Sequence, residues 1–177
     1  MFLLLFCLNY LFCKRLKLKK LNLIYPGKVK SEELKKLKSL TDLVDLRLVR
    51  SNVNDDVLRN LAELKNLEVL SFERHPLLTG KGFTFFKDHK KLTKLNVAMG
   101  GIKDLDSLAQ IKPLKVLDLR RTSIRAQHFN GIKFNPQLKV FLGDSFRIEF
   151  DDVDIDAKGG IQILPFHKPN QFLDFPK

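Results

Sequence analysis

The sequence predicts an α/β solenoid in which about five units of 22–25 residues stack side by side, each with a short strand and a helical segment. Three observations indicate this fold. A leucine-rich strand spacing recurs at nearly constant steps, a second apolar pattern of helical spacing lies between successive strands, and turn residues separate the two. With 44% hydrophobic and 29% charged residues, the chain has the composition of a folded domain.

The spacing L-x-x-L-x-L marks the expected strands. Its last two positions are two residues apart and therefore lie on one face of a strand, while the residue between them lies on the other face. The motif begins at Leu18, Leu43, Leu67, Leu92 and Leu114, so its step is nearly constant along the chain. A sixth start, Leu138 with Phe141, is expected one step further on and ends at Gly143.

Apolar residues also occur nine, six and three positions before each new strand motif. This three-residue spacing places them on one face of an α- or 3₁₀-helical segment. The two patterns define 30 inward positions, and only His89 and Asn135 among them are not apolar. Chance at this composition would fill about 13 of them. Stacked units bury both apolar faces, so we expect a concave parallel sheet and a helical convex side.

Turn residues follow each strand motif, at Pro26-Gly27, Ser51-Asn52, His75-Pro76, Gly100-Gly101 and Thr122-Ser123. With these turns, the chain resembles the leucine-rich repeat family. The best matches are 92–111, LTKLNVAMGGIKDLDSLAQI, and 114–124, LKVLDLRRTSI, within a resemblance that covers 18–141, most of the chain. The family usually has Asn or Cys after the third leucine, where this chain has Pro26, Ser51, His75, Gly100 and Thr122. A regular asparagine ladder is therefore not expected.

The ends of the chain form two further parts around the solenoid of residues 18–142. Residues 1–17 are apolar and then basic. A helix of residues 2–13 would be about 18 Å long, too short for a hydrocarbon core of about 30 Å. We interpret the segment as a packed cap, leaving open a degenerate targeting segment or a mis-assigned start. Localisation stays unknown: the cytoplasm is favoured, and secretion or membrane anchoring is open if residues 1–13 act as a signal.

The tail, residues 143–177, leaves the repeat. Residues 146–155 alternate as a strand does, Lys158–Gly160 resembles a turn, and residues 161–165 are expected to pair back. This hairpin would cap the last repeat, and residues 167–177 would form a loose end.

Little in the sequence indicates catalysis or ligand chemistry. It has no glycine-rich phosphate loop, no Cys/His cluster with metal spacing and no nucleophile motif. Residues 152–156 have the D-x-D-x-D spacing of a calcium loop, but Ala157 and Ile163 replace the required Gly and Glu. We therefore expect a protein that is not an enzyme and has no metal, cofactor or small-molecule substrate. His75 is expected in solvent, and His89 partly buried with a backbone hydrogen bond.

The net charge of +12 is concentrated near one end. Residues 14–40 hold ten basic residues against Glu32 and Glu33, which gives +8 and leaves +4 for the rest of the chain. A solvated lysine face is one interpretation, and contact with anionic lipid, nucleic acid or an acidic protein is the other.

Side chains that alternate with the strand leucines are expected to point out of the concave sheet. Seven are predicted partner-contact residues: Asn22, Arg47, Ser71, Asn96 and Asp118 in one row, with Glu73 and Arg120 beside it. Their mixed charge suits a protein more than a phosphate backbone. We therefore predict a non-catalytic protein-binding module with a partner of unknown identity. The alternative is a membrane-surface or nucleic-acid binder acting through residues 14–40. Because Arg47, Glu73 and Arg120 fill no core position, replacing these three with Ala is not expected to affect folding.

Overall fold

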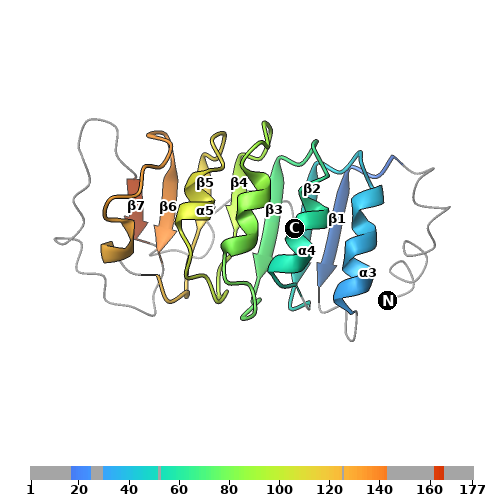
Figure 1. Cartoon of the computed structure of the whole chain (residues 1–177), viewed down its shortest axis with the longest axis horizontal. Helices are drawn as coiled ribbons and strands as arrows, with labels where there is room; N and C mark the ends of the chain where they lie inside the picture. Colours follow the sequence, from blue (N-terminus) through green and yellow to red (C-terminus); the bar gives the residue numbers. More distant parts are fainter. Residues whose placement is uncertain (1–16, 25–29, 52, 125, 143–161, 166–177) are drawn as a thin grey trace.

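The computed structural model describes residues 17–24, 30–51, 53–124, 126–142 and 162–165. Seven strands form one parallel sheet in chain order: β1 (Lys20–Ile24), β2 (Asp45–Val49), β3 (Val69–Glu73), β4 (Lys94–Asn96), β5 (Val116–Asp118), β6 (Lys139–Leu142) and β7 (Gln162–Pro165). The helical segments between them are α3 (Ser31–Lys35), η1 (Lys36–Ser39), α4 (Asp55–Leu61), η2 (Lys81–Phe86), α5 (Asp106–Ala109) and η3 (Ala126–Phe129). Figure 1 shows α3, α4 and α5 on one side of the sheet. The predicted solenoid architecture is confirmed.

The strands pair in step with the sequence repeat. Along β1 to β5, the residues in register are Leu21, Leu46, Leu70, Leu95 and Leu117. The same leucine of each motif therefore lies beside its equivalent in the next unit. All five are buried, and they belong to one apolar cluster that runs from Leu21 to Leu142. The core is therefore continuous along the solenoid, as stacking of units requires.

The sixth strand is shifted by one position from the prediction. Val140, and not the predicted Phe141, pairs with Leu117. Val140 and Leu142 are buried, whereas Phe141 lies beside Asp118 on the outward side and is partly exposed. Because side chains alternate along a strand, such a shift exchanges the two faces. Leu138 stays buried in the turn before the strand.

The tail contributes strand β7, in the segment 161–165 that was predicted to pair back as the second strand of a hairpin. Strand β7 pairs in parallel with β6, and Ile163 lies opposite Val140, as Val140 lies opposite Leu117. Parallel pairing extends the sheet beyond residue 142. The other expected hairpin strand, 146–155, lies outside the described residues, as do residues 1–13, the turn at 158–160 and residues 166–177.

The carboxylate of Asp55 fastens one unit to the next. Its Oδ2 accepts hydrogen bonds from the hydroxyl and the backbone N–H of Thr79, at 2.5 and 3.2 Å. Its Oδ1 accepts from the N–H groups of Gly80 and Gly82, at 3.2 and 3.1 Å. A Cβ at Gly82 would lie 2.6 Å from the Asp55 carbonyl oxygen, so a side chain there would push the two segments apart. The start of η2 is thus held against the start of α4.

One residue within three positions after each of the strands β2 to β5 has a left-handed backbone. Arg50, Arg74, Met99 and Arg121 have φ values of 53°, 65°, 55° and 55°. The first three donate their backbone N–H to the neighbouring unit, to the carbonyls of Glu73, Ala98 and Arg120 at 3.1, 2.9 and 2.8 Å. This repeated conformation adds a last bond between units and then turns the chain out of the sheet. Glycine adopts such φ values most easily, yet none of the four is glycine.

Candidate protein-binding face

The predicted row of contact residues is assembled by the strand register. We call the side of the sheet that carries these residues the outer strand face. Asn22 pairs with Arg47, Arg47 with Ser71, Ser71 with Asn96, and Asn96 with Asp118. Residues that are one repeat apart in the sequence thus become direct neighbours across β1 to β5.

Only part of this row reaches solvent. Asn22 is exposed, and Arg47, Glu73 and Arg120 are partly exposed. The remaining three predicted contact residues are buried, at 4% exposure for Ser71, 7% for Asn96 and 0% for Asp118. The alternation of side chains along the strands did not predict that these three would be buried.

Two bidentate ion pairs organise the outer strand face. Arg47 donates from Nε and Nη2 to the two carboxylate oxygens of Asp45, at 2.9 and 2.8 Å. Arg120 donates in the same way to Asp118, at 2.9 and 2.7 Å, and its backbone N–H donates to Asp118 Oδ1 at 3.0 Å. Partners two residues apart on a strand share a face, and the planar guanidinium matches a carboxylate. The sequence analysis missed these pairs, although the spacing D-L-R at 45–47 and 118–120 indicates them.

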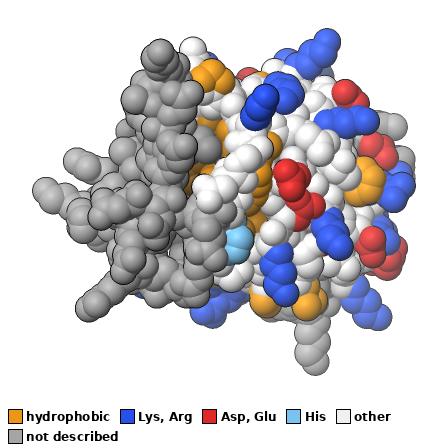
Figure 2. Space-filling view, turned by 60° about the vertical axis from the view of Figure 1, so that its left-hand side comes forward, with side chains coloured by type: hydrophobic (Ala, Val, Ile, Leu, Met, Phe, Trp, Pro, Cys, Tyr) orange, Lys and Arg blue, Asp and Glu red, His pale blue; other side chains and the backbone are white. Residues whose placement is uncertain are grey.

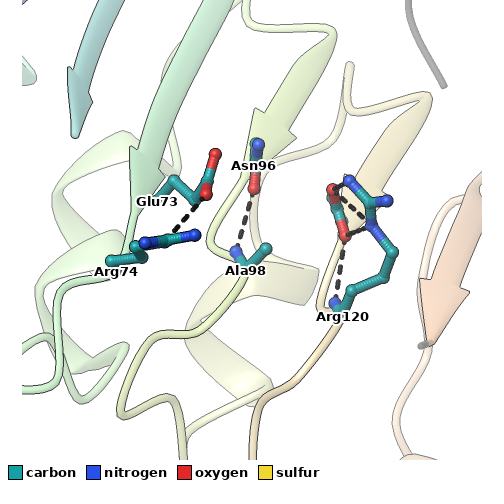
Figure 3. A network of polar contacts seen from close by, with 6 residues as sticks. Glu73, Arg74, Asn96, Ala98 and Arg120 are labelled. Atoms are coloured by element: carbon teal, nitrogen blue, oxygen red, sulfur yellow. Dashed lines mark hydrogen bonds and ion pairs between the residues drawn. The ribbon is translucent and has the colours of Figure 1, made fainter. Parts of the chain in front are cut away.

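Two further polar side chains of the central strands, Glu73 and Asn96, also have internal partners. Figure 3 shows Glu73 and Arg74 at the end of β3. The Nε of Arg74 donates a hydrogen bond to the Glu73 carboxylate at 3.2 Å. Beside them, the Asn96 side-chain oxygen accepts the N–H of Ala98 at 2.9 Å. The polar groups that make these contacts are thus held in fixed orientations before any partner binds.

These contacts change the expected cost of altering the face. Asp45 is 7% exposed and Asp118 is fully buried, so removing either arginine would leave a buried carboxylate without its main partner. Contrary to the sequence-based expectation, we therefore expect replacement of Arg47 or Arg120 to lower the stability of the fold.

His75 is buried, at 1% exposure, and not in solvent as the sequence suggested. Its Nε2 lies 2.9 Å from the Leu48 carbonyl of the preceding unit, so Nε2 carries the proton and donates it. The ring also packs edge-on against Phe72, with centroids 6.0 Å apart. Burial lowers the pKa of His75, and the backbone hydrogen bonds oppose this shift only in part. His75 therefore links two units at the position where the resembled family usually has Asn.

His89 occupies a core position without a hydrogen bond. It is 2% exposed, its ring lies 5.3 Å from that of Phe86, and neither ring nitrogen has a hydrogen-bond partner in the described part of the chain. Burial, and then the nearby charge of Lys65, lower the pKa of His89 to about 4. The Leu64 carbonyl favours the protonated ring but does not meet hydrogen-bond geometry with it. The expected backbone hydrogen bond is not formed.

We expect acid to destabilise the fold through His89. The unfolded chain protonates this residue near its ordinary pKa of 6.5, and the folded chain only near about 4. Between these values the unfolded state binds more protons, so stability falls as the pH drops through this window. The gap corresponds to roughly 3 kcal/mol. Urea unfolding from neutral pH to about pH 4 should show this loss, and His89→Leu should reduce it. The exposed His128→Gln is the control, and an equal pH dependence of all three proteins would contradict the assignment.

Metal-ligating groups and membrane-spanning helices were both sought among the described residues. They hold no group of three or more His, Cys, Asp or Glu side chains placed for a metal ion. Among their helices, none is both long and apolar enough to cross a membrane. What decides the fold is the chain-ordered parallel sheet, whose strands recur at a nearly constant sequence spacing with helical connections on one side. The fold is that of a leucine-rich-repeat solenoid.

Comparison of this leucine-rich-repeat solenoid with known proteins finds similarity to solved structures. No family model and no curated protein matches its sequence. A similar solved structure is that of internalin C2 from Listeria monocytogenes, with 21% sequence identity and a TM-score of 0.47. The match covers 71% of this solenoid protein and 61% of internalin C2, so the chain corresponds to less than two thirds of that protein's length.

Proposed function

We propose that this solenoid is a non-catalytic protein-interaction module whose partner docks on the outer strand face. Leucine-rich-repeat folds typically serve as protein-interaction modules and are generally non-catalytic. The observation that carries the proposal for this face is the pair of guanidinium groups, Arg47 and Arg120, each held by a bidentate carboxylate. Side chains that are ordered before binding lose less entropy when a partner docks, and arginine is enriched at binding hot spots.

The dimensions and chemistry of the face support a protein partner. Strands are about 4.8 Å apart, so β1 to β5 span roughly 19 Å, enough for a helix or loop of another protein. Ile24 is 57% exposed and lies in register with Val49, which in turn pairs with Glu73. Apolar surface therefore borders the charged groups, a mixture that suits a protein interface more than a phosphate backbone.

Affinity capture from the source cell tests the proposal. The face variant combines Asp45→Asn, Arg47→Gln, Asp118→Asn and Arg120→Gln, which removes both charges of each pair and leaves no buried carboxylate without its partner. We expect it to weaken capture of the partner by at least about tenfold, or about 1.4 kcal/mol. Lys87→Ala, at an exposed position of the helical side, is the matched control and should capture as well as wild type. Thermal unfolding of each variant establishes that it is folded.

The basic segment, residues 14–40, is the alternative binding site, and changing it gives the result that would contradict docking on the outer strand face. The basic segment includes Lys35 and Lys36, whose ammonium groups lie 2.6 and 2.8 Å from Glu32 and Glu33. Part of its charge is thus balanced locally. Capture that survives in the face variant but is lost after Lys35→Gln, Lys36→Gln and Lys38→Gln would contradict docking on the strands. It would favour a membrane or nucleic-acid contact through residues 14–40.

A further inference from the structure

We infer that a second surface, the arginine edge formed by Arg50, Arg74 and Arg121, binds an extended acidic segment of a protein partner. Arg50 and Arg74 directly follow β2 and β3, and Arg121 comes three residues after the end of β5, so the three lie along the edge at which the chain leaves the sheet. Arg50 and Arg121 are exposed, and Arg74 is partly exposed. This edge adjoins the outer strand face at Glu73, which contacts Arg74, but it includes none of the residues on which the proposed function rests.

The backbone at the arginine edge makes arginine an unexpected choice. All three residues have φ between 53° and 65°, a region that costs an L-residue about 1 kcal/mol or more relative to glycine. The bonds that Arg50 and Arg74 make to the neighbouring unit's carbonyls come from their backbone N–H groups, which glycine would supply equally well. The backbone turn at these positions therefore does not require an arginine side chain. Unfavourable backbone conformations that persist in a structure are a reason to look for a function.

The type of residue points to carboxylate recognition. The chain has 23 lysines and only 9 arginines, yet three of the four left-handed positions that follow strands are arginine. If only a positive charge were needed at these positions, lysine would supply it as well as arginine. Arginine differs in presenting a planar fork of donors that binds a carboxylate through two hydrogen bonds. In Arg74 the contact with Glu73 engages Nε, one of five guanidinium donors.

The spacing of the edge fits an extended chain. Arg50 and Arg74 are one strand apart and Arg74 and Arg121 are two, so at about 4.8 Å per strand the three span roughly 14 Å. In an extended peptide, side chains on one side recur about every 6.8 Å. Carboxylates at positions i, i+2 and i+4 therefore span about 13.6 Å, and long arginine stems can adjust to the remaining difference.

The surroundings of the edge favour a peptide over a nucleic acid. A carboxylate stands at the edge itself, since Glu73 lies next to Arg74 and contacts its guanidinium, and Met99 interrupts the series of arginines. Figure 2 shows Lys and Arg side chains separated by acidic and uncharged surface on the face in view, and not gathered in one stripe. A phosphate backbone requires a continuous basic track.

Fluorescence anisotropy with the full chain tests this inference. The probe is a labelled peptide of alternating glutamate and serine, and the same peptide with glutamine in place of glutamate is the reference. We expect the combined Arg50→Gly, Arg74→Gly and Arg121→Gly variant to bind the glutamate probe at least about tenfold more weakly. Its melting temperature should stay equal or rise, because glycine relieves the positive φ. Met99→Gly makes the same backbone change without removing charge and should bind as wild type.

Two results would overturn the inference. One is that wild type and the triple glycine variant bind the glutamate probe equally well, or that wild type binds the glutamate and glutamine probes equally well. The other is tighter binding of a single-stranded oligouridylate than of the glutamate probe, lost in the triple variant, which would assign the edge to nucleic acid. Neither result bears on partner capture by the outer strand face, so failure here and failure of the proposed function are distinguishable.

Discussion

Leu95→Ala is expected to lower the free energy of unfolding by about 2–5 kcal/mol. Leu95 is 1% exposed and lies in β4, where it is in register with Leu70 on one side and Leu117 on the other. Removing its side-chain carbons loses their burial and leaves a cavity that fixed neighbours on both sides fill only in part. Because one core runs along the whole chain of units, this loss is expected to shift a single cooperative urea transition.

Lys87→Ala is the matched control for this prediction. Lys87 follows η2 on the helical side and is exposed, so its replacement should change the free energy of unfolding by no more than about 0.5 kcal/mol. Equal urea midpoints for the two variants would contradict the assignment of Leu95 to the core.

Arg120→Ala should cost about 3 kcal/mol although Arg120 lies outside the core. Its guanidinium makes two short hydrogen bonds to Asp118, whose side chain is fully buried. Removing one partner of such a pair leaves a charge in a poorly hydrated site, which typically costs about 3–5 kcal/mol. The lower end applies here because Arg120 is partly exposed and its backbone N–H still reaches Asp118 after the change.

A double-mutant cycle with Asp118→Asn identifies the cause. If the cost of Arg120→Ala comes from the uncompensated carboxylate, neutralising that carboxylate should recover about 1–2 kcal/mol in the double variant. Urea unfolding of the four proteins gives the coupling energy. Additive effects of the two changes would show that Arg120 stabilises the fold only through packing of its stem.

The repeat and the core are determined by the sequence alone. The steps between leucine motifs predict the strand register from β1 to β5, and the inward positions predict the buried leucines. The prediction succeeds because side chains repeat every two residues along a strand and about every 3.6 residues along a helix. The spacing of apolar residues therefore identifies the buried face of each element. Stacking then follows, since no unit can bury its apolar faces alone.

The contacts of polar residues were decided only by the tertiary structure. Three features depend on which units are neighbours and on the register between their strands. They are the burial of Asp118, the hydrogen bond from His75 to Leu48 and the parallel pairing of β7. The single-position shift at Val140 shows the same dependence, because Val140 and Phe141 are both apolar and spacing alone does not say which faces inward. Apolar burial requires only the right face, whereas hydrogen bonds and ion pairs require a partner atom at about 3 Å. Such a partner here lies up to 27 residues away, where local periodicity carries no information.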